Sequence, residues 1–271
     1  NAVLGHVALS EYAGLLAMLR DSVAAETRVI PSVGPTYGMM MDQAQILREF
    51  EFPTAMVLPS REGATPAGFA LALRRFSDRC GRPAILYLKF DGTLDVGTIT
   101  KLALDGVIGC VKYAIPRPRI EDDPFLKALV DAVGGSRIVS GMGERPVPVH
   151  LTKFGLASFT TGCGCIAPRA CLDLLLALKR GDTATADALY ARFMPLENLR
   201  ESISLIRVLH DAVTQCGVAD MGPQLPLLSA SPAERMGEIK ALASELLAFE
   251  MQHRGQPAQA ARRPQQQQQQ Q

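Results

Sequence analysis

Two polar residues at the ends of neighbouring apolar segments could together do chemistry. Tyr87 lies near the end of residues 83–88, and Lys112 ends residues 107–112, the next apolar segment along the chain. A lysine among apolar side chains is partly desolvated, which favours its neutral, nucleophilic amine. A phenol beside it could move protons while the amine adds to a carbonyl group. The pair therefore indicates an imine-forming site, although a lysine that simply reaches solvent and a packed tyrosine would give the same pattern.

The elements that must position this pair recur regularly along the chain. Six apolar segments are typical of buried parallel strands: residues 28–33, 53–58, 83–88, 107–112, 137–141 and 157–161. Between and after them the pattern predicts helices, at residues 41–49, 67–79, 95–104, 124–133, 145–154 and 167–179. Parallel strands require crossover helices, so the alternation predicts an α/β fold built from βα units.

The number of these units leaves two architectures open. A complete (β/α)8 barrel takes about 250 residues, whereas residues 1–181 hold six units. Either an open doubly wound sheet or a barrel whose first two strands precede Asn1 would fit. After Gly181 the sequence predicts a helical extension over residues 182–251, with helices at 183–194, 197–216 and 231–251, and then a disordered Gln-rich tail over 252–271.

Composition and motifs exclude several classes of protein. The 28 Lys and Arg against 27 Asp and Glu leave a formal charge of +1, with no basic stretch typical of nucleic-acid binding. The apolar runs are far shorter than the roughly 20 residues of a membrane span. Cys163, Cys165 and Cys171 lack a fourth ligand at the spacing of a zinc site. We therefore expect a cytoplasmic protein with reduced cysteines that binds no metal, nucleic acid or membrane.

Four segments, in their order and spacing, resemble the dihydrodipicolinate synthase/N-acetylneuraminate lyase family. They are Ile85-Leu86-Tyr87, residues 106–112 (GVIGCVK), Val139-Ser140-Gly141 and residues 155–168 (GLASFTTGCGCIAP), within a resemblance that runs from about residue 1 to 227. The resemblance implies a (β/α)8 TIM barrel with C-terminal helices. About six of its eight βα units would then be present in residues 1–181, without the first two strands.

The resemblance also implies roles for individual residues. Lys112 matches the lysine that forms an imine with pyruvate or a related 2-oxo acid, and Tyr87 matches the tyrosine that relays protons. Gly141, at the end of the seventh barrel strand, and Thr160 and Thr161, at the end of the eighth, match positions of substrate contacts. Thr160 could equally be a strand-end residue that makes hydrogen bonds without a ligand.

Three departures from the family pattern bear on the substrate. The family's Gly-Thr-Thr-Gly-Glu loop, which holds the carboxylate of the 2-oxo acid, would fall at residues 1–5, which read Asn-Ala-Val-Leu-Gly and leave Asn1 as a candidate contact. A tyrosine pair and an arginine of the synthases are replaced by segments that contain Arg61 and Lys89. Each of these two could bind a substrate carboxylate or be an ordinary solvated charge. The changes argue against dihydrodipicolinate synthase activity itself.

Two classes of function remain. The favoured one is a Schiff-base lyase of the class I aldolase or dehydratase type, acting on pyruvate or another 2-oxo acid such as a 2-oxo sugar acid. The imine is the electron sink, so no cofactor is expected. The resemblance further implies a homo-oligomer. The alternative is a catalytically silent barrel that binds a small acid or serves as an oligomeric partner protein.

Overall fold

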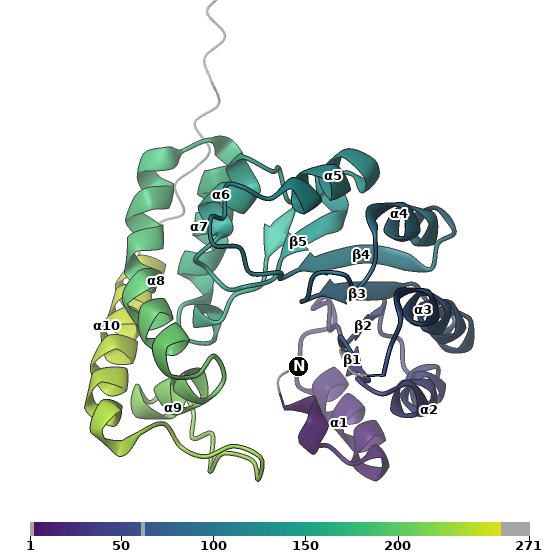
Figure 1. Cartoon of the computed structure of the whole chain (residues 1–271). Helices are drawn as coiled ribbons and strands as arrows, with labels where there is room; N and C mark the ends of the chain where they lie inside the picture. The colour runs from purple at the N-terminus through teal and green to yellow at the C-terminus, as the bar shows by residue number, and fades with distance from the viewer. Residues whose placement is uncertain (1–2, 61–62, 256–271) are drawn as a thin grey trace, which may run out of the picture.

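The chain forms one sheet of six parallel strands, described in a computed structural model that covers residues 3–60 and 63–255 (Figure 1). Each predicted strand segment overlaps one of the strands, so all six predictions are confirmed; β4 extends one residue past its predicted end. The strands are β1 (Ser32–Val33), β2 (Ala55–Val57), β3 (Ala84–Leu88), β4 (Ile108–Tyr113), β5 (Ile138–Ser140) and β6 (Ser158–Phe159). They pair strictly in sequence order, and every pairing is parallel.

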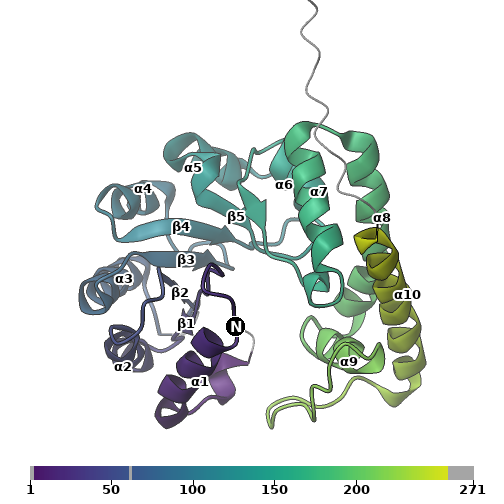
Figure 2. The same ribbon diagram turned by 180° about the vertical axis from the view of Figure 1, so that it is seen from behind.

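Helices alternate with these strands. They are α1 (Leu9–Asp21), α2 (Tyr37–Leu47), α3 (Pro66–Cys80), α4 (Val96–Leu104), α5 (Pro124–Val133), α6 (Val147–Thr152) and α7 (Pro168–Arg180). Figures 1 and 2 show α2 to α5 along the outer side of a curved sheet. In a doubly wound sheet the strand order reverses at a switch point, and no reversal occurs here. The architecture is therefore that of a TIM barrel, with no pairing between β1 and β6 in the part of the chain that the structure describes.

Side-chain caps fix where several helices begin. Thr65 accepts a hydrogen bond from the Gly68 amide ahead of α3, and Asp95 accepts one from the Thr98 amide ahead of α4. Asp123 does the same for α5. Such caps satisfy amides that have no partner within the helix. They therefore also fix the length of the loops that leave the carboxyl ends of the strands.

The C-terminal helices differ from their predicted bounds. They are α8 (Thr183–Ile203), α9 (Arg207–Gln215) and α10 (Met236–Arg254). The predicted break between residues 194 and 197 is wrong, because α8 continues through Pro195. A proline removes one helical hydrogen bond, but Leu196 and Leu199 beyond it are buried in the core and hold the helix together. Residues 252–254, predicted as tail, are part of α10, and residues 256–271 lie outside the described part.

Two hydrophobic cores lie side by side in the molecule. The first joins the sheet to α1 through α5 and includes Leu86, Val111 and Ile138. The second joins α6 through α10 and includes Leu174 and Phe193. The loops that follow β5 and β6 connect the two cores. None of the described helices is long and apolar enough to cross a membrane.

Candidate active site

Tyr87 and Lys112 lie side by side near the carboxyl ends of β3 and β4. The two strands pair in parallel with Tyr87 opposite Lys112. The side-chain amine of Lys112 lies over the tyrosine ring, with Nζ 4.2 Å from the ring centroid. The sequence predicts this close approach, and the structure shows it. The amine contacts the face of the ring, which is a cation–π geometry whenever the lysine is protonated.

The surroundings of this pair favour a neutral amine and a protonated phenol. Burial, and to a smaller extent the positive charge of Lys89, lower the pKa of Lys112 from its ordinary 10.5 to about 8. Burial raises the pKa of the Tyr87 hydroxyl. A neutral amine is the nucleophilic form, and a protonated phenol can donate a proton. The protonation states therefore suit the addition of the amine to a carbonyl group.

Gly141 follows β5 and leaves room for the lysine. Its amide donates a hydrogen bond to the Tyr113 carbonyl, 2.7 Å away, which extends the pairing of β5 with β4. A Cβ atom at this position would lie 2.8 Å from Cγ of Lys112 and 2.9 Å from the Tyr113 carbonyl oxygen. Both distances are shorter than non-bonded contacts allow. Gly141 thus supports the position of Lys112, and its contact with substrate stays a prediction.

Thr160 and Thr161, which follow β6, make different hydrogen bonds. The amide of Thr160 donates to the Ser140 carbonyl at 2.8 Å and continues the ladder between β5 and β6. The hydroxyl of Thr161 donates to the Glu144 carboxyl group and accepts from the Gly164 amide at 2.7 Å. This hydroxyl therefore already binds two groups of the protein. The role of either threonine in substrate binding stays a prediction.

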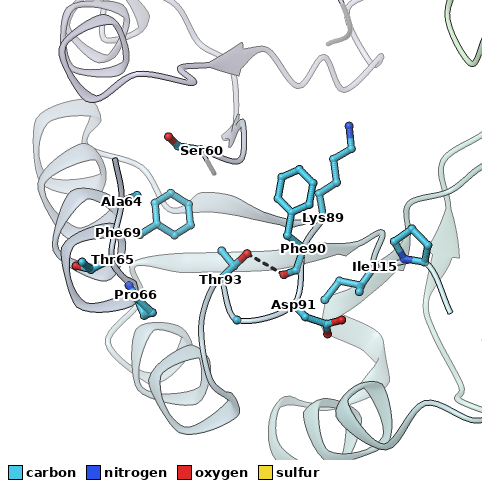
Figure 3. Close-up of a pocket in the computed structure, with 12 residues that line it drawn as sticks. Ser60, Ala64, Thr65, Pro66, Phe69, Lys89, Phe90, Asp91, Thr93 and Ile115 are labelled. Atoms are coloured by element: carbon cyan, nitrogen blue, oxygen red, sulfur yellow. Dashed lines mark hydrogen bonds between the residues drawn. The ribbon is translucent and has the colours of Figure 1, made fainter. Parts of the chain in front are cut away.

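A pocket of about 440 Å³ opens beyond the ends of β2, β3 and β4 (Figure 3). Its lining residues are Ser60, Ala64, Thr65, Pro66, Phe69, Lys89, Phe90, Asp91, Gly92, Thr93, Ile115 and Pro116. Neither Tyr87 nor Lys112 is among them, so the pocket lies beside the pair. Lys89 is the predicted binding residue that borders it, whereas Arg61 and Asn1 lie outside the described residues.

An ion-pair network fixes one wall of the pocket and has no counterpart in the predicted site. Arg117 contacts Asp91 at 2.8 Å and Asp123 at 3.0 Å, while the Tyr113 hydroxyl also donates to Asp123. The Asp123 side chain is fully buried. Because Asp91 belongs to the lining, the network connects the turn after β3 to the start of α5. The sequence gives no signal for it beyond the cap motif at Asp123.

A second polar group that sequence reasoning missed lies behind the ends of β5 and β6. One carboxylate oxygen from each of Glu144 and Glu197 and the sulfur of Cys163 lie within 4.8 Å of one another. The guanidinium of Arg200, 2.8 Å from Glu197, already supplies a positive charge there, and we assign no metal to this group. The only sequence signal is the three-residue spacing of Glu197 and Arg200 along one helix.

Comparisons with known proteins give one distant relative and many similar structures. A probable 5-dehydro-4-deoxyglucarate dehydratase of Streptomyces coelicolor is 24% identical over 230 residues, which are 83% of this chain and 70% of that protein. Dihydrodipicolinate synthase from Oceanobacillus iheyensis superposes with a TM-score of 0.75 at 21% identity, covering 91% of this chain and 80% of that one. YagE of Escherichia coli K12, solved with pyruvate, gives a TM-score of 0.75 at 18% identity, over 89% and 83% of the chains. No family model matches the chain.

The fold and the arrangement of strand-end residues are those of a TIM-barrel protein. The solved structures establish the fold, and the curated relative adds a match in sequence over most of the chain. The chain thus shares its fold with structures of dihydrodipicolinate synthases, the family that the sequence resembles.

Proposed function

We propose that this protein is a Schiff-base lyase of the aldolase or dehydratase type that acts on a 2-oxo acid. One observation carries the proposal: the half-buried amine of Lys112 lies 4.2 Å from the centroid of the Tyr87 ring. The pair lies near the carboxyl ends of the strands, where the active sites of TIM-barrel enzymes are found. Burial lowers the pKa of that amine to about 8, so a usable fraction is neutral near neutral pH. The fold family supports the proposal, since the structure of one neighbour was solved with pyruvate.

The reaction would begin with addition of the neutral Lys112 amine to the C2 carbonyl of the substrate. The carbinolamine then loses water and becomes a protonated imine. Tyr87 is the proton donor for this step, because its phenol is protonated and its ring contacts the amine. The positive imine withdraws electrons from C3, so the Tyr87 phenolate left by that donation can take a C3 proton. If this proton is then passed to a C4 hydroxyl, which departs as water, the reaction is a dehydration. If the phenolate instead takes the proton of the C4 hydroxyl while the C3–C4 bond breaks, the reaction is an aldol cleavage.

The neighbouring pocket favours a substrate longer than pyruvate. Its lining includes the apolar side chains of Phe69 and Ile115 and the cationic side chain of Lys89. A volume of about 440 Å³ exceeds what the three carbons of pyruvate need. We infer that the far end of a 2-oxo sugar acid enters this pocket and that Lys89 binds its distal carboxylate. The name of the curated relative, a dehydratase of a deoxy sugar acid, supports the same substrate class.

Borohydride trapping tests the proposal directly. The protein is mixed with pyruvate or with longer 2-oxo acids, reduced with borohydride, and examined by intact mass and peptide mapping. We expect one adduct, on Lys112, which the Lys112→Ala variant loses. The matched control is Lys101→Ala, which removes an exposed lysine paired with Asp105 and should trap normally.

Two outcomes would overturn the lyase assignment. One is the absence of any adduct across the panel of 2-oxo acids, and the other is an adduct that maps to a different lysine. Either result would favour the silent barrel, which would bind a small acid without transforming it. Self-association and a cytoplasmic location stay predictions, and light scattering at several protein concentrations tests the first of them.

A further inference from the structure

Four buried side chains form a polar group that the lyase chemistry does not use. We call Glu144, Cys163, Glu197 and Arg200 the carboxyl cluster. Glu144 follows β5, Cys163 follows β6, and the other two lie on α8. Glu144, Cys163 and Glu197 have no solvent exposure, and Arg200 is 7% exposed. Ionised groups buried this completely are costly unless each one has a partner.

Glu197 is the carboxylate that pairs with Arg200. The guanidinium Nη2 donates to Oε2 of Glu197 at 2.9 Å, and Nε lies 2.8 Å from Oε1. The same carboxylate accepts a hydrogen bond from the Glu144 amide at 3.3 Å and from the Cys163 thiol at 3.5 Å. Glu197 therefore has an ion-pair partner and three hydrogen-bond donors beside it. The pair is electrically neutral by itself.

Glu144 has no such cationic partner. Its Oε1 accepts from the Thr161 hydroxyl and from the Cys163 amide at 3.2 Å. Its Oε2 is buried and has no hydrogen-bond partner among the residues that the structure describes. As a carboxylate, Glu144 would add a second negative charge beside Glu197 with one guanidinium to offset both. A proton on Oε2 removes that charge and turns the unsatisfied oxygen into a donor.

Among the described residues, the other titratable groups around Glu144 place no second cation in contact with its carboxyl group. They are Cys163 and Cys165 of the turn after β6, Cys171 of α7, Tyr190 of α8, and the adjacent Arg145. Burial raises the pKa of the three thiols and of the phenol, so all four are neutral. Arg145 pairs with Glu201 at 2.8 Å on a more exposed side of α8. The charge balance within the carboxyl cluster therefore leaves a place for one proton.

We propose that the Glu144 carboxyl group keeps a proton in the folded protein, and that this proton holds the loops after β5 and β6 against α8. The first loop begins at Gly141, against Lys112, and the second carries Thr160 and Thr161. Glu144 thus positions two loops that border the candidate active site. The inference does not depend on the proposed lyase chemistry, because it concerns the folded state alone.

The sign of the pH effect follows from the protonation states. Burial first, and the charge of Glu197 second, raise the pKa of Glu144 from 4.5 to about 7. The folded protein therefore holds the proton more tightly than the unfolded chain does. Stability is greatest below the unfolded value and falls as pH rises toward 7, with no further change from this group above about pH 8.

The test compares the wild-type protein with Glu144→Gln, in which an amide replaces the protonated carboxyl group. Chemical unfolding is measured at a series of pH values from about 5 to about 9. We expect the wild-type unfolding constant, divided by that of the variant, to rise by up to tenfold per pH unit between about pH 5 and pH 7 and then to level off. Glu238→Gln, at an exposed carboxylate paired with Arg235, should keep the wild-type profile.

Infrared spectroscopy of the wild-type protein is an independent measurement. It tests whether Glu144 is protonated even if Glu144→Gln does not fold. The band of a protonated carboxyl group should be present near pH 6 and lost by about pH 8. A ratio of unfolding constants that is flat with pH, or the absence of this band, would overturn the proposal. It would also fail if EDTA destabilised the wild-type protein but not Glu144→Gln, because a bound cation would then occupy the place of the proton.

Discussion

Replacing Lys89 with methionine should make Lys112 a slower nucleophile at neutral pH. The positive charge of Lys89 is the smaller of the two causes that lower the pKa of Lys112 to about 8, and burial is the larger. Methionine keeps most of the length of the side chain and removes its charge. The pKa of Lys112 should therefore rise in this variant while remaining below 10.5, because burial persists.

The magnitude follows from the fraction of neutral amine. At pH 7 a lysine with a pKa of 8 is about 10% neutral, whereas one with a pKa of 10.5 is about 0.03% neutral, a ratio of about 300. Since Lys89 supplies the smaller part of the shift, its removal should slow imine formation by several-fold, well below that limit. The difference should disappear at a pH where the amine is neutral in both proteins.

The assay is the initial rate of adduct formation with pyruvate and cyanoborohydride, followed by intact mass across a pH series. Pyruvate is the appropriate probe because it has no distal carboxylate for Lys89 to bind. The wild-type profile should have its midpoint near pH 8, and that of Lys89→Met should lie higher. Lys101→Met, at an exposed lysine, serves as the control. Equal midpoints in all three proteins, or a wild-type midpoint near 10.5, would refute the electrostatic reasoning.

Three further substitutions test the structure around the site. Gly141→Ala should destabilise the protein by about 1–3 kcal/mol and slow trapping, because its Cβ would overlap Lys112, whereas Gly237→Ala in α10 meets open space and should be neutral or stabilising. Tyr87→Phe should still be trapped but lose turnover by about 100- to 10,000-fold, as expected for removal of a proton relay. Asp123→Asn should lower the free energy of unfolding by about 3 kcal/mol, because it breaks a buried ion pair, while Asp131→Asn at an exposed pair should change it by less than about 0.5 kcal/mol.

Each of these expectations has a measurement that can contradict it. Urea unfolding gives the stabilities, and equal midpoints for the two glycine variants would show that the close approach at Gly141 is relaxed without cost. Full turnover in Tyr87→Phe would assign the proton relay to another group. Equal losses in the two aspartate variants would show that burial of the Asp123 pair adds nothing.

The regular alternation of strands and helices was predictable because it depends on local patterns. Apolar segments such as residues 83–88 and 107–112 form strands where predicted, since buried parallel strands need apolar side chains on both faces. The predicted helix break between residues 194 and 197 is wrong because tertiary packing, and not the local pattern, decides there. The local preference of Pro195 for a helix end is overridden by the burial of Leu196 and Leu199, which depends on distant parts of the chain.

The residues of the candidate site were likewise predictable where the strand pattern places them and unpredictable where tertiary packing does. Lys112 and Tyr87 could be paired in advance, because parallel strands that follow each other in a barrel bring their carboxyl ends together. Glu144 and Glu197 could not, because they are far apart in the sequence and meet only through the packing of α8 behind β5 and β6. The contact between Arg117 and Asp91 could not be predicted either, since both residues look like ordinary loop charges in the sequence.

The division of the molecule into two hydrophobic cores bears on how it would unfold. Separate cores can open as separate cooperative units, each with its own free energy. The strands that carry Tyr87 and Lys112 belong to the first core, whereas α7 and α8, against which Glu144 and Thr161 pack, belong to the second. Opening of the second unit alone would displace the loops beside the lysine and leave the first unit folded. Heat inactivation would then precede the loss of amide-exchange protection in the sheet.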